Sequence, residues 1–372
     1  MDIVRLDIEE LELALVEPFE TSFGVELRRR FLLVHLEDAQ GTEGWGECVA
    51  SREPLYSEET VASAWSFLAE CVVPRWRKTP PSDLEGVTRL LAAFRGNRMA
   101  KSALQQALVD QSARRARQPL ARWLGGRRSH IPVGVSVGIH PTASRLVARV
   151  GRYVDDGYRR IKLKVRPGYD AEPVGAVRRA FPDLTLWVDA NQAYAPTAGP
   201  RIAAWARQLR VAQVEQPFPE RALRAHARLA RRAPFRVCLD ESIVDSESLD
   251  DALDVRAMTS VNVKTGRIGG PLVARELARR AVRHGVVAWV GGMLESGVGR
   301  AHNVHFASLG AFTLPGDISA SDRYYLDEII DRPFALERDG TLAVPSGPGT
   351  GVELAEPAHR RAVRRRRSYR LK

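Results

Sequence analysis

Polar residues recur at an almost constant interval between residues 161 and 264, each at the end of a short apolar run. Lys164 ends RRIKLK, Asp189 ends LWVD, Glu215 ends AQVE, Asp240 ends VCLD and Lys264 ends SVNVK. The intervals are 25, 26, 25 and 24 residues, which suits one strand, one helix and two loops. Repeated βα units of this size close into a parallel barrel whose strands end at one face. We therefore expect these five side chains to face one another.

Eight apolar runs are predicted to be the strands of this barrel, and only seven helices have room between them. They lie at residues 133–139, 160–165, 185–190, 211–215, 236–240, 260–264, 286–291 and 311–314. Short runs rich in Val, Ile and Leu that alternate with helical stretches are typical of βαβ units. The prediction is an α/β fold in which residues 127–320 form the catalytic barrel.

The preceding residues, 1–126, are predicted to form a separate α+β domain. Residues 3–16 and 31–37 alternate apolar and polar side chains, which is typical of half-buried antiparallel strands. Helical periodicity follows at residues 57–71 and 99–116.

The connection over residues 18–30 contains Pro18 and Gly24, so we expect a mobile loop with few backbone partners. After the eighth strand the pattern has hairpin signals and little helical periodicity. Residues 321–372 are therefore expected to return to the first domain, which becomes a discontinuous cap. This arrangement places the 18–30 loop over the barrel mouth, where it covers the substrate.

The charge of the chain bears on its partners. A formal net charge of +11 is compatible with a nucleic-acid or membrane partner. The excess arginines, however, are spread over expected helix faces, and only RRAVRRRR near the C-terminus is a concentrated block. We interpret that block as a solvated, frayed terminus, with a polyanion-binding arm as the alternative. We expect a small-molecule carboxylate substrate, no nucleic-acid partner, no membrane partner and a homo-oligomer.

The apolar runs, the N-terminal residues and the cysteines indicate the compartment of the protein. No apolar run approaches the ~20 residues of a membrane helix, and the N-terminal residues lack the basic start and apolar core of a signal peptide. Cys48, Cys71 and Cys238 have no metal-binding spacing, so we expect reduced structural thiols. The sequence thus predicts a cytoplasmic protein.

Three carboxylates at successive strand ends, Asp189, Glu215 and Asp240, predict a metal site. A single strand-end aspartate is more often a helix cap or a surface charge. Three that converge in one barrel mouth repel each other unless a cation lies between them. Oxygen ligands without His or Cys favour Mg²⁺ or Mn²⁺ over zinc.

Three lysines complete the site and indicate its chemistry. Lys162 and Lys164 point to the same side of one strand, and Lys264 arrives from the opposite side of the barrel. We expect neighbouring cations and a bound metal to lower the pKa of a lysine enough for it to act as a base. These groups suit removal of the proton next to a carboxylate, because metal and ammonium stabilise the enediolate that forms. Racemisation, epimerisation and syn elimination are all accessible from it.

The whole motif set resembles the enolase superfamily, in its muconate-lactonising-enzyme-like subgroup. Within it, the sequence is similar to the o-succinylbenzoate synthase and N-succinylamino-acid racemase family. The matching segments are GVSVGI, VDANQAY, VEQPF, CLDESI, VNVKTGRIGG, GGMLESGVGRAHN and PGDISASDRYY. The resemblance covers nearly the whole chain and implies a (β/α)7β modified TIM barrel with an α+β capping domain.

The resemblance also implies residue roles. Asp189, Glu215 and Asp240 would bind Mg²⁺ or Mn²⁺, Lys164 and Lys264 would be the acid/base pair, and Lys162 would stabilise the substrate carboxylate and lower the pKa of Lys164. Asn191 and Glu241 would support this set. The expected substrate-binding residues are Phe19, Phe23, Ser136, Asn191, Arg267, Gly292, Met293 and Glu295. Thr265 departs from the family, since many members have proline there.

The leading hypothesis is an N-succinylamino-acid (N-acylamino-acid) racemase of amino-acid metabolism, with possible o-succinylbenzoate synthase activity in menaquinone biosynthesis. A dipeptide epimerase or a muconate-type cycloisomerase is the alternative within the class. Dipeptide epimerases of this subgroup bind the substrate ammonium with an aspartate motif on the eighth strand, where this chain has Asp317. A non-catalytic binding protein on a degraded enzyme scaffold is the alternative from another class, but no expected ligand or lysine is missing.

Overall fold

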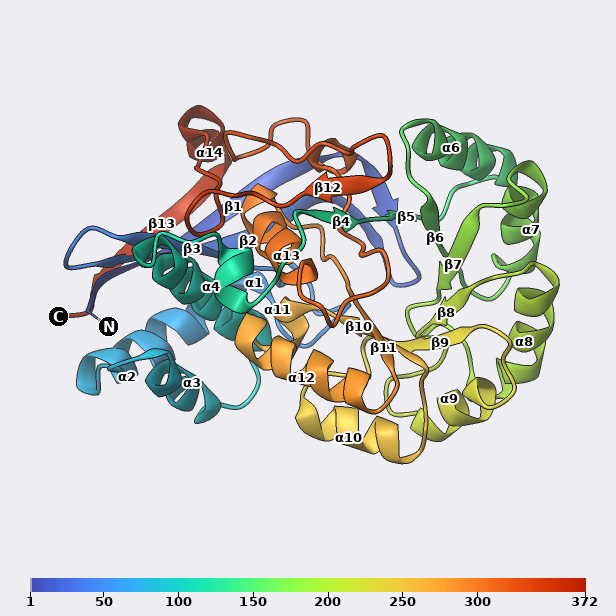
Figure 1. Cartoon of the computed structure of the whole chain (residues 1–372), viewed down its shortest axis with the longest axis horizontal. Coiled ribbons are helices and arrows are strands. Elements are labelled where there is room, and N and C mark those ends of the chain that lie inside the picture. Colours follow the sequence, from blue (N-terminus) through green and yellow to red (C-terminus); the bar gives the residue numbers. More distant parts are fainter. Residues whose placement is uncertain (1) are drawn as a thin grey trace.

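Two large sheets organise the computed structural model, which describes residues 2–372 (Figure 1). One is a four-stranded antiparallel sheet in the order β13-β1-β2-β3, and the other is a seven-stranded parallel sheet in the order β11-β10-β9-β8-β7-β6-β5. A small third sheet pairs β12 with β4. Within the described residues no helix is long and apolar enough to cross a membrane.

The antiparallel sheet and its helices form the capping domain. Its strands are β1 (Ile3–Glu20), β2 (Val25–Asp38), β3 (Glu43–Cys48) and β13 (Val363–Arg370). Its helices are α1 (Val61–Ser66), the π-helical η1 (Phe67–Val72), α2 (Val73–Lys78), α3 (Leu84–Ala92) and α4 (Arg98–Arg115). The alternating apolar residues of the strands, such as Leu6, Ile8 and Val34, share one buried core with Leu68 and Leu104 of the helices.

The parallel sheet is the wall of the barrel. Its strands are β5 (Val135–Val137), β6 (Arg160–Lys164), β7 (Thr185–Asp189), β8 (Gln213–Glu215), β9 (Arg236–Leu239), β10 (Ser260–Val263) and β11 (Val287–Val290). Seven helices follow them: α6 (Ala143–Asp155), α7 (Ala171–Ala180), α8 (Gly199–Gln208), α9 (Leu223–Ala230), α10 (Ser246–Asp254), α12 (Pro271–Arg283) and α13 (Gly297–Ala307). Helices cover the outer face and side chains fill the inner face, so strand residues of both parities are buried. This is the expected (β/α)7β barrel.

Shorter elements connect these units. They are α5 (Leu120–Leu124), β4 (His130–Pro132), η2 (Pro196–Ala198), α11 (Thr265–Ile268), η3 (Ser321–Arg323), β12 (Thr341–Ala343) and α14 (Glu356–Ala362). Among them, α5 and β4 lead from the capping domain into the barrel, and α14 precedes the last strand, β13 (Figure 1).

The eighth strand differs from its prediction at residues 311–314. The chain closes the barrel there through two isolated parallel bridges, Ala288 with Phe312 and Val133 with Gly316. Pro315 lies between them and has no N–H to donate, which prevents a continuous ladder. The first strand is also shorter than predicted, since β5 covers only Val135–Val137 and the N–H of Val133 donates to the carbonyl of Gly340 (3.1 Å).

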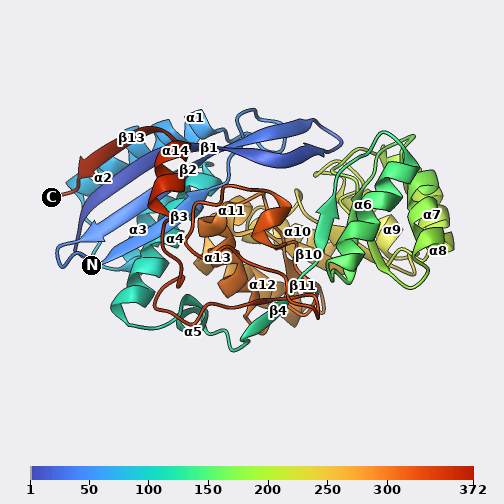
Figure 2. The same ribbon diagram turned by 90° about the horizontal axis from the view of Figure 1, so that it is seen from above.

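The 18–30 segment also differs from its prediction. β1 continues to Glu20 and β2 begins at Val25, so only residues 21–24 form the turn. Phe19 pairs with Glu26, and a register shift between Ala14 and Phe19 accommodates Pro18. The expectation of few backbone partners was therefore wrong: the segment is a β-ribbon that reaches from the capping sheet to the barrel beside α6 (Figure 2).

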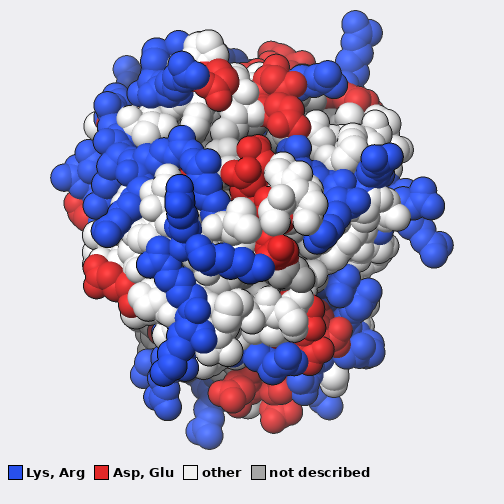
Figure 3. Space-filling view, turned by 90° about the vertical axis from the view of Figure 1, so that its left-hand side faces the viewer, with Lys and Arg blue, Asp and Glu red and all other residues white. Residues whose placement is uncertain are grey.

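The basic C-terminal block is not frayed. It forms β13, which pairs antiparallel with β1 along Arg5–Leu11. Its arginines contact acidic side chains of β1: Arg365 Nε lies 2.7 Å from Glu10, and Arg366 Nη2 lies 2.6 Å from Asp7. Figure 3 shows basic side chains gathered on this face with acidic ones between them. Much of the apparent polycation is thus paired within the capping sheet.

A buried carboxylate joins the two domains. Glu47 of β3 accepts hydrogen bonds from Ser296 Oγ (2.5 Å), Ser296 N (3.1 Å) and Gly299 N (3.0 Å) at the start of α13. Complete burial raises the pKa of Glu47 to about 8, against the effect of these donors. The contact caps the free N–H groups of α13 and ties the loop that follows β11 to the cap.

The packing of β3 against α4 generates a stability prediction. A Cβ on Gly46 would lie 2.0 Å from the carbonyl oxygen of Ala103, so Gly46→Ala must displace the helix. We expect a loss of about 1–3 kcal/mol in the free energy of unfolding. Gly310→Ala is the matched control, because nothing lies within 4 Å of its added Cβ. Equal denaturation midpoints for the two variants would contradict this account.

Candidate active site

The carboxyl ends of the central barrel strands lie in register. Lys164 pairs with Asp189, Asp189 with Glu215, and Glu215 with Cys238. Residues paired in this way point to the same face of a sheet. Asp240 lies two residues beyond Cys238 and so shares that direction. The alignment places Asp189 and Glu215 at one level of the barrel mouth, with Asp240 two residues nearer the carboxyl end of its strand.

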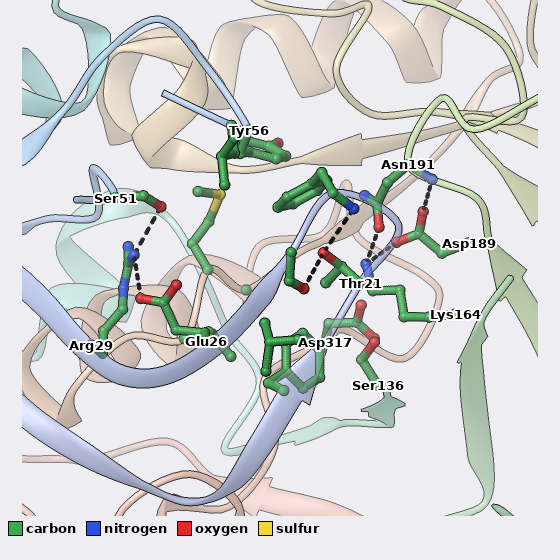
Figure 4. Close-up of a pocket in the computed structure, with 18 of the residues that line it drawn as sticks. Thr21, Glu26, Arg29, Ser51, Tyr56, Ser136, Lys164, Asp189, Asn191 and Asp317 are labelled. Atoms are coloured by element: carbon green, nitrogen blue, oxygen red, sulfur yellow. Dashed lines mark hydrogen bonds and ion pairs between the residues drawn. The ribbon is translucent and has the colours of Figure 1, made fainter. Parts of the chain in front are cut away.

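Two of the three lysines lie on β6, and their ammonium groups contact the carboxylates directly. Lys162 Nζ lies 2.8 Å from Glu215 Oε2 and 3.2 Å from Asp189 Oδ2. Its third partner is Asp317 Oδ2 at 2.6 Å. Lys164 Nζ donates to Asp189 Oδ2 (2.7 Å) and to Asn191 Oδ1 (2.6 Å; Figure 4). Both lysines are therefore fixed by charge-assisted contacts on one side of the site.

A second cluster surrounds Asp240 on the opposite side. Lys264 Nζ donates to Asp240 Oδ2 (2.7 Å) and to the hydroxyl of Tyr56 (3.1 Å). Arg267 contacts the other oxygen of Asp240 and donates through Nε to the carbonyl of Ile243 (2.8 Å). Tyr56 comes from the capping domain and donates to Asp240 Oδ1 at 3.1 Å. The cap thus supplies one member of the barrel site.

The buried charges of the site balance in number. The five carboxylates are Asp189, Glu215, Asp240, Glu241 and Asp317, and the five cations are Arg160, Lys162, Lys164, Lys264 and Arg267. Burial of an ion is costly unless a partner of opposite charge accompanies it. Four of the carboxylates contact these cations directly, whereas Glu241 accepts a hydrogen bond from Asn191 Nδ2 (3.1 Å) and its other oxygen has no partner.

These contacts shift several pKa values. Burial and the charge of Asp189 raise the pKa of Glu241 to about 7, and they also raise the pKa of Glu215. For Lys162, burial lowers the pKa, but the charges of Asp317, Glu215 and Asp189 outweigh it and the pKa rises. The pKa of Lys264 is raised in the same way, led by Tyr56 and Glu215. We expected neighbouring cations and a bound metal to lower the pKa of a lysine. In the structure the carboxylates that contact Lys162 and surround Lys264 raise both pKa values instead.

The strand-end carboxylates fit a metal ion by their chemistry but not in their present arrangement. Across residues 2–372, no three His, Cys, Asp or Glu side chains lie close enough together to hold an ion as they stand. Ammonium and guanidinium groups occupy the oxygens of Asp189, Glu215 and Asp240 instead. The chemistry nevertheless fits a hard divalent cation, because three buried carboxylates lie at the carboxyl ends of three neighbouring strands. Binding requires the cations to leave those oxygens.

A pocket opens beside the lysines and is lined by both domains (Figure 4). Six of the expected substrate-binding residues line it: Phe19, Phe23, Ser136, Asn191, Gly292 and Met293. The hydroxyl of Ser136 is buried there without a hydrogen-bond partner. Lys162, Lys164, Lys264 and Asp189 also reach the pocket.

Two expected substrate-binding residues are not on the pocket wall. Arg267 lies behind Asp240, where its Nη2 donates to the carbonyl of Asn262 (2.5 Å). Glu295 accepts from the backbone N–H of Met293 (2.8 Å) and from Asn303 Nδ2 (2.8 Å), so its carboxylate is directed into the loop. Both side chains support their neighbours instead of lining the cavity.

Sequence reasoning missed several pocket residues. Tyr56 and Ser51 come from the loop after β3, and Arg29 and Glu26 come from β2. Arg29 is buried and donates to Ser51 Oγ at 2.9 Å. Glu26 Oε1 lies 3.7 Å from Arg29 Nη1, at the end of the pocket remote from Lys164 (Figure 4). The alternating pattern of β2 does not indicate that Glu26 and Arg29 line the pocket, because the sequence does not show that the ribbon lies next to the barrel.

Strained backbone marks the strand ends. Asn191, Gln192, Gln216 and Leu294 follow barrel strands and have φ between 33° and 69°. Such values are uncommon for residues other than glycine and concentrate at functional sites. At Asn191 this conformation accompanies the contact between its side chain and Lys164.

Comparison with known proteins agrees with the fold. Residues 5–125 match the family Mandelate racemase / muconate lactonizing enzyme, N-terminal domain, and residues 145–358 match Enolase C-terminal domain-like. An N-succinylamino acid racemase of Amycolatopsis is 45% identical over 95% of both chains. An o-succinylbenzoate synthase of Geobacillus kaustophilus is 42% identical over 95% of this chain and 94% of its own. A solved enolase-superfamily structure from Listeria innocua superposes with a TM-score of 0.95 at 34% identity and covers both chains fully.

The fold and the site define a barrel enzyme of the isomerase or lyase type. The chain belongs to the mandelate racemase / muconate lactonizing enzyme family of the enolase superfamily. Members of this superfamily generally depend on a divalent metal, which agrees with the carboxylate set at the strand ends.

The ion pairs of Asp240 generate a prediction for the metal-free protein. Asp240→Asn leaves Lys264 and Arg267 buried without their shared anion. We expect the free energy of unfolding to fall by about 3–5 kcal/mol, the usual cost of breaking a buried pair. Asp250→Asn is the matched control: its pair with Arg280 is partly exposed, so the expected change is within about 0.5 kcal/mol. Denaturation in EDTA measures both, and similar losses would contradict the assignment.

Proposed function

We propose that this enzyme racemises N-acylated amino acids, with N-succinylamino acids as the leading substrate class. Dehydration of the o-succinylbenzoate precursor is proposed as a second activity of the same site. One observation carries this: Lys164 and Lys264 both line the pocket and end strands separated by half of the eight-membered barrel wall. The two relatives that share 45% and 42% identity with the chain bear these two names.

We infer that Asp189, Glu215 and Asp240 hold Mg²⁺ or Mn²⁺. When bound, such an ion acts as a Lewis acid that polarises the substrate carboxylate and stabilises charge on the enediolate. The buried charges of the site are balanced without it, so a divalent cation introduces a net positive charge. A substrate with two carboxylates, as an N-succinylamino acid has, would offset both charges, which is why we favour an anionic substrate.

The chain's own residues then move the proton. Lys164, in its neutral form, takes the α-proton from one face of the carbon, and Lys264 as the ammonium returns a proton to the other face. The opposite enantiomer uses the reverse pair. Lys162 faces the substrate carboxylate and opposes the negative charge that grows there. Asn191 holds Lys164 through the 2.6 Å contact.

The dipeptide epimerase alternative is less favoured. That activity requires a carboxylate free to bind the substrate ammonium. Asp317 already contacts Arg160 with one oxygen and Lys162 with the other. A neutral acylamide, in contrast, needs no such anion. The muconate-type cycloisomerase stays an alternative that product analysis separates from racemisation.

Several further points are part of the proposal. The apolar pocket residues Phe19, Phe23, Leu55 and Met293 suit an amino acid with an apolar side chain. A location in the cytoplasm, a homo-oligomer and a role in menaquinone biosynthesis stay predictions. We also propose that residues 1–126 with 321–372 act as the cap and 127–320 as the catalytic barrel.

Metal dependence is the first test. Removal of divalent ions with EDTA should abolish racemisation, and Mg²⁺ or Mn²⁺ should restore it. Glu215→Gln should weaken metal binding, measured by calorimetry, because it removes an anionic ligand. Full activity after exhaustive metal removal would refute the ligand assignment.

The two lysines can be separated by isotope exchange. Replacing Lys164 by Ala should abolish racemisation, yet Lys264 should still exchange the α-proton of the enantiomer that faces it. Lys264→Ala should show the opposite preference. The measurement is NMR of the α-proton of each enantiomer in D₂O. Equal loss for both enantiomers in both variants would eliminate the two-base mechanism.

The turn of the ribbon tests substrate coverage. We propose that residues 18–30 cover the bound substrate, because Ser22 Oγ donates to the carbonyl of Asn191 (3.2 Å) across the pocket. Amide exchange at residues 21–24 should slow when a substrate analogue binds. Substitutions of Phe19 or Phe23 should change side-chain preference more than substitutions in the barrel. Unchanged exchange with saturating analogue would count against coverage.

A further inference from the structure

A buried arginine occupies the interior of the barrel below the active site. The side chain of Arg160 is 1% exposed, and its guanidinium lies 4.3 Å from the ring centroid of Trp187. Nη2 donates to the carbonyl of Pro315 at 2.9 Å. Gly134 provides the space, since a Cβ there would lie 2.3 Å from Arg160 Cζ. Stacking, a carbonyl and a missing side chain together hold this group in one position.

Asp317 connects this arginine to the active site. One carboxylate oxygen lies 2.5 Å from Arg160 Nη1 and the other lies 2.6 Å from Lys162 Nζ. The side chain is 8% exposed, so water screens these contacts little. Arg160, Asp317 and Lys162 therefore form a continuous chain of ion pairs from the barrel interior to the pocket.

The partners of Lys162 differ in their role. Its ammonium contacts Glu215, Asp189 and Asp317. Glu215 and Asp189 are proposed metal ligands, so their oxygens would be shared with a bound ion. Asp317 is the one of the three that stays with Lys162. Without Asp317, a bound ion would repel the Lys162 ammonium, and no carboxylate outside the proposed metal ligands would contact that ammonium.

We propose that Asp317 and Arg160 are positioning residues, which keep Lys162 directed at the substrate carboxylate in the loaded enzyme. The inference rests on the proposed function for the role of Lys162. Arg160 acts at one remove: it fixes the orientation of the Asp317 carboxylate and neutralises its second oxygen. The pair also explains why a buried arginine lies inside the barrel, where apolar residues usually pack.

The test is a double-mutant cycle between Asp317 and Lys162. Asp317→Asn should lower kcat for α-proton exchange about tenfold or more, with a smaller change in KM, because charge on the carboxylate grows towards the transition state. In the Lys162→Met background the same substitution should cost less than about twofold. Equal losses in both backgrounds would overturn the proposal, since Asp317 would then act independently of Lys162.

A second readout needs no substrate. In Asp317→Asn, the remaining ion-pair partners of Lys162 are Asp189 and Glu215, so the lysine competes with Mg²⁺ for these two carboxylates. Calorimetric titration should give weaker Mg²⁺ binding in this variant than in the wild type, and little difference when both proteins also carry Lys162→Met. An undiminished effect in the Lys162→Met pair would also overturn the proposal.

Asp110→Asn is the matched control. Asp110 is a fully buried carboxylate of α4 that contacts Arg114 at 3.2 Å, outside the active site. This variant should lose stability and keep its kcat and its Mg²⁺ affinity. If kcat fell as much as in Asp317→Asn, general destabilisation would explain the effect of Asp317→Asn. Arg160→Lys keeps the charge without the flat stacking surface, so its kcat should lie between those of the wild type and Asp317→Asn. A kcat equal to that of the wild type would remove Arg160 from the proposal.

The two proposals can fail separately. If the wild type exchanges no α-proton of any N-acylamino acid, the proposed function fails, while the Mg²⁺ titration still decides whether Asp317 and Lys162 are coupled.

Discussion

The balance of buried charge at the barrel mouth is the constraint on which the rest of the structure depends. Five carboxylates and five cations lie buried at the barrel mouth and in the barrel interior beneath it. Such a set is stable only if every group keeps its partner, because an uncompensated buried ion costs several kcal/mol. The in-register pairing of β6, β7 and β8 supplies that geometry, since it aligns Lys164, Asp189 and Glu215 on one level.

The capping domain completes the site more than it covers it. Tyr56 contacts Asp240 and Lys264 directly, and the β1–β2 ribbon contributes Phe19, Phe23, Glu26 and Arg29 to the pocket. Glu47 holds the start of α13 and thereby the loop with Met293. The lysines and the strand-end carboxylates thus lie on the barrel, whereas the wall of the pocket combines cap residues with barrel residues such as Ser136 and Gly292.

Three expectations failed, and they were all judged from local signals: a proline, a short apolar run and a block of arginines. In the ribbon at residues 18–30, Phe19 pairs with Glu26 because a register shift accommodates Pro18. The eighth strand is reduced to isolated bridges on either side of Pro315. The basic terminus forms a strand that pairs with β1, where Arg366 contacts Asp7, 359 residues away in the sequence. Local propensity cannot include a pairing partner that is absent from the window.

The sequence by itself determined the barrel and the placement of three carboxylates and the lysines at strand ends, because a period near 25 residues and the two-residue alternation of Lys162 and Lys164 are properties of the chain alone. Only the tertiary structure decided which groups those residues contact. Arg160 meets Asp317 across 157 residues, and Tyr56 meets Asp240 across 184. It also turned Arg267 and Glu295 away from the pocket. The physical reason is that an ion pair depends on distance in space, which closure of the barrel and docking of the cap establish together.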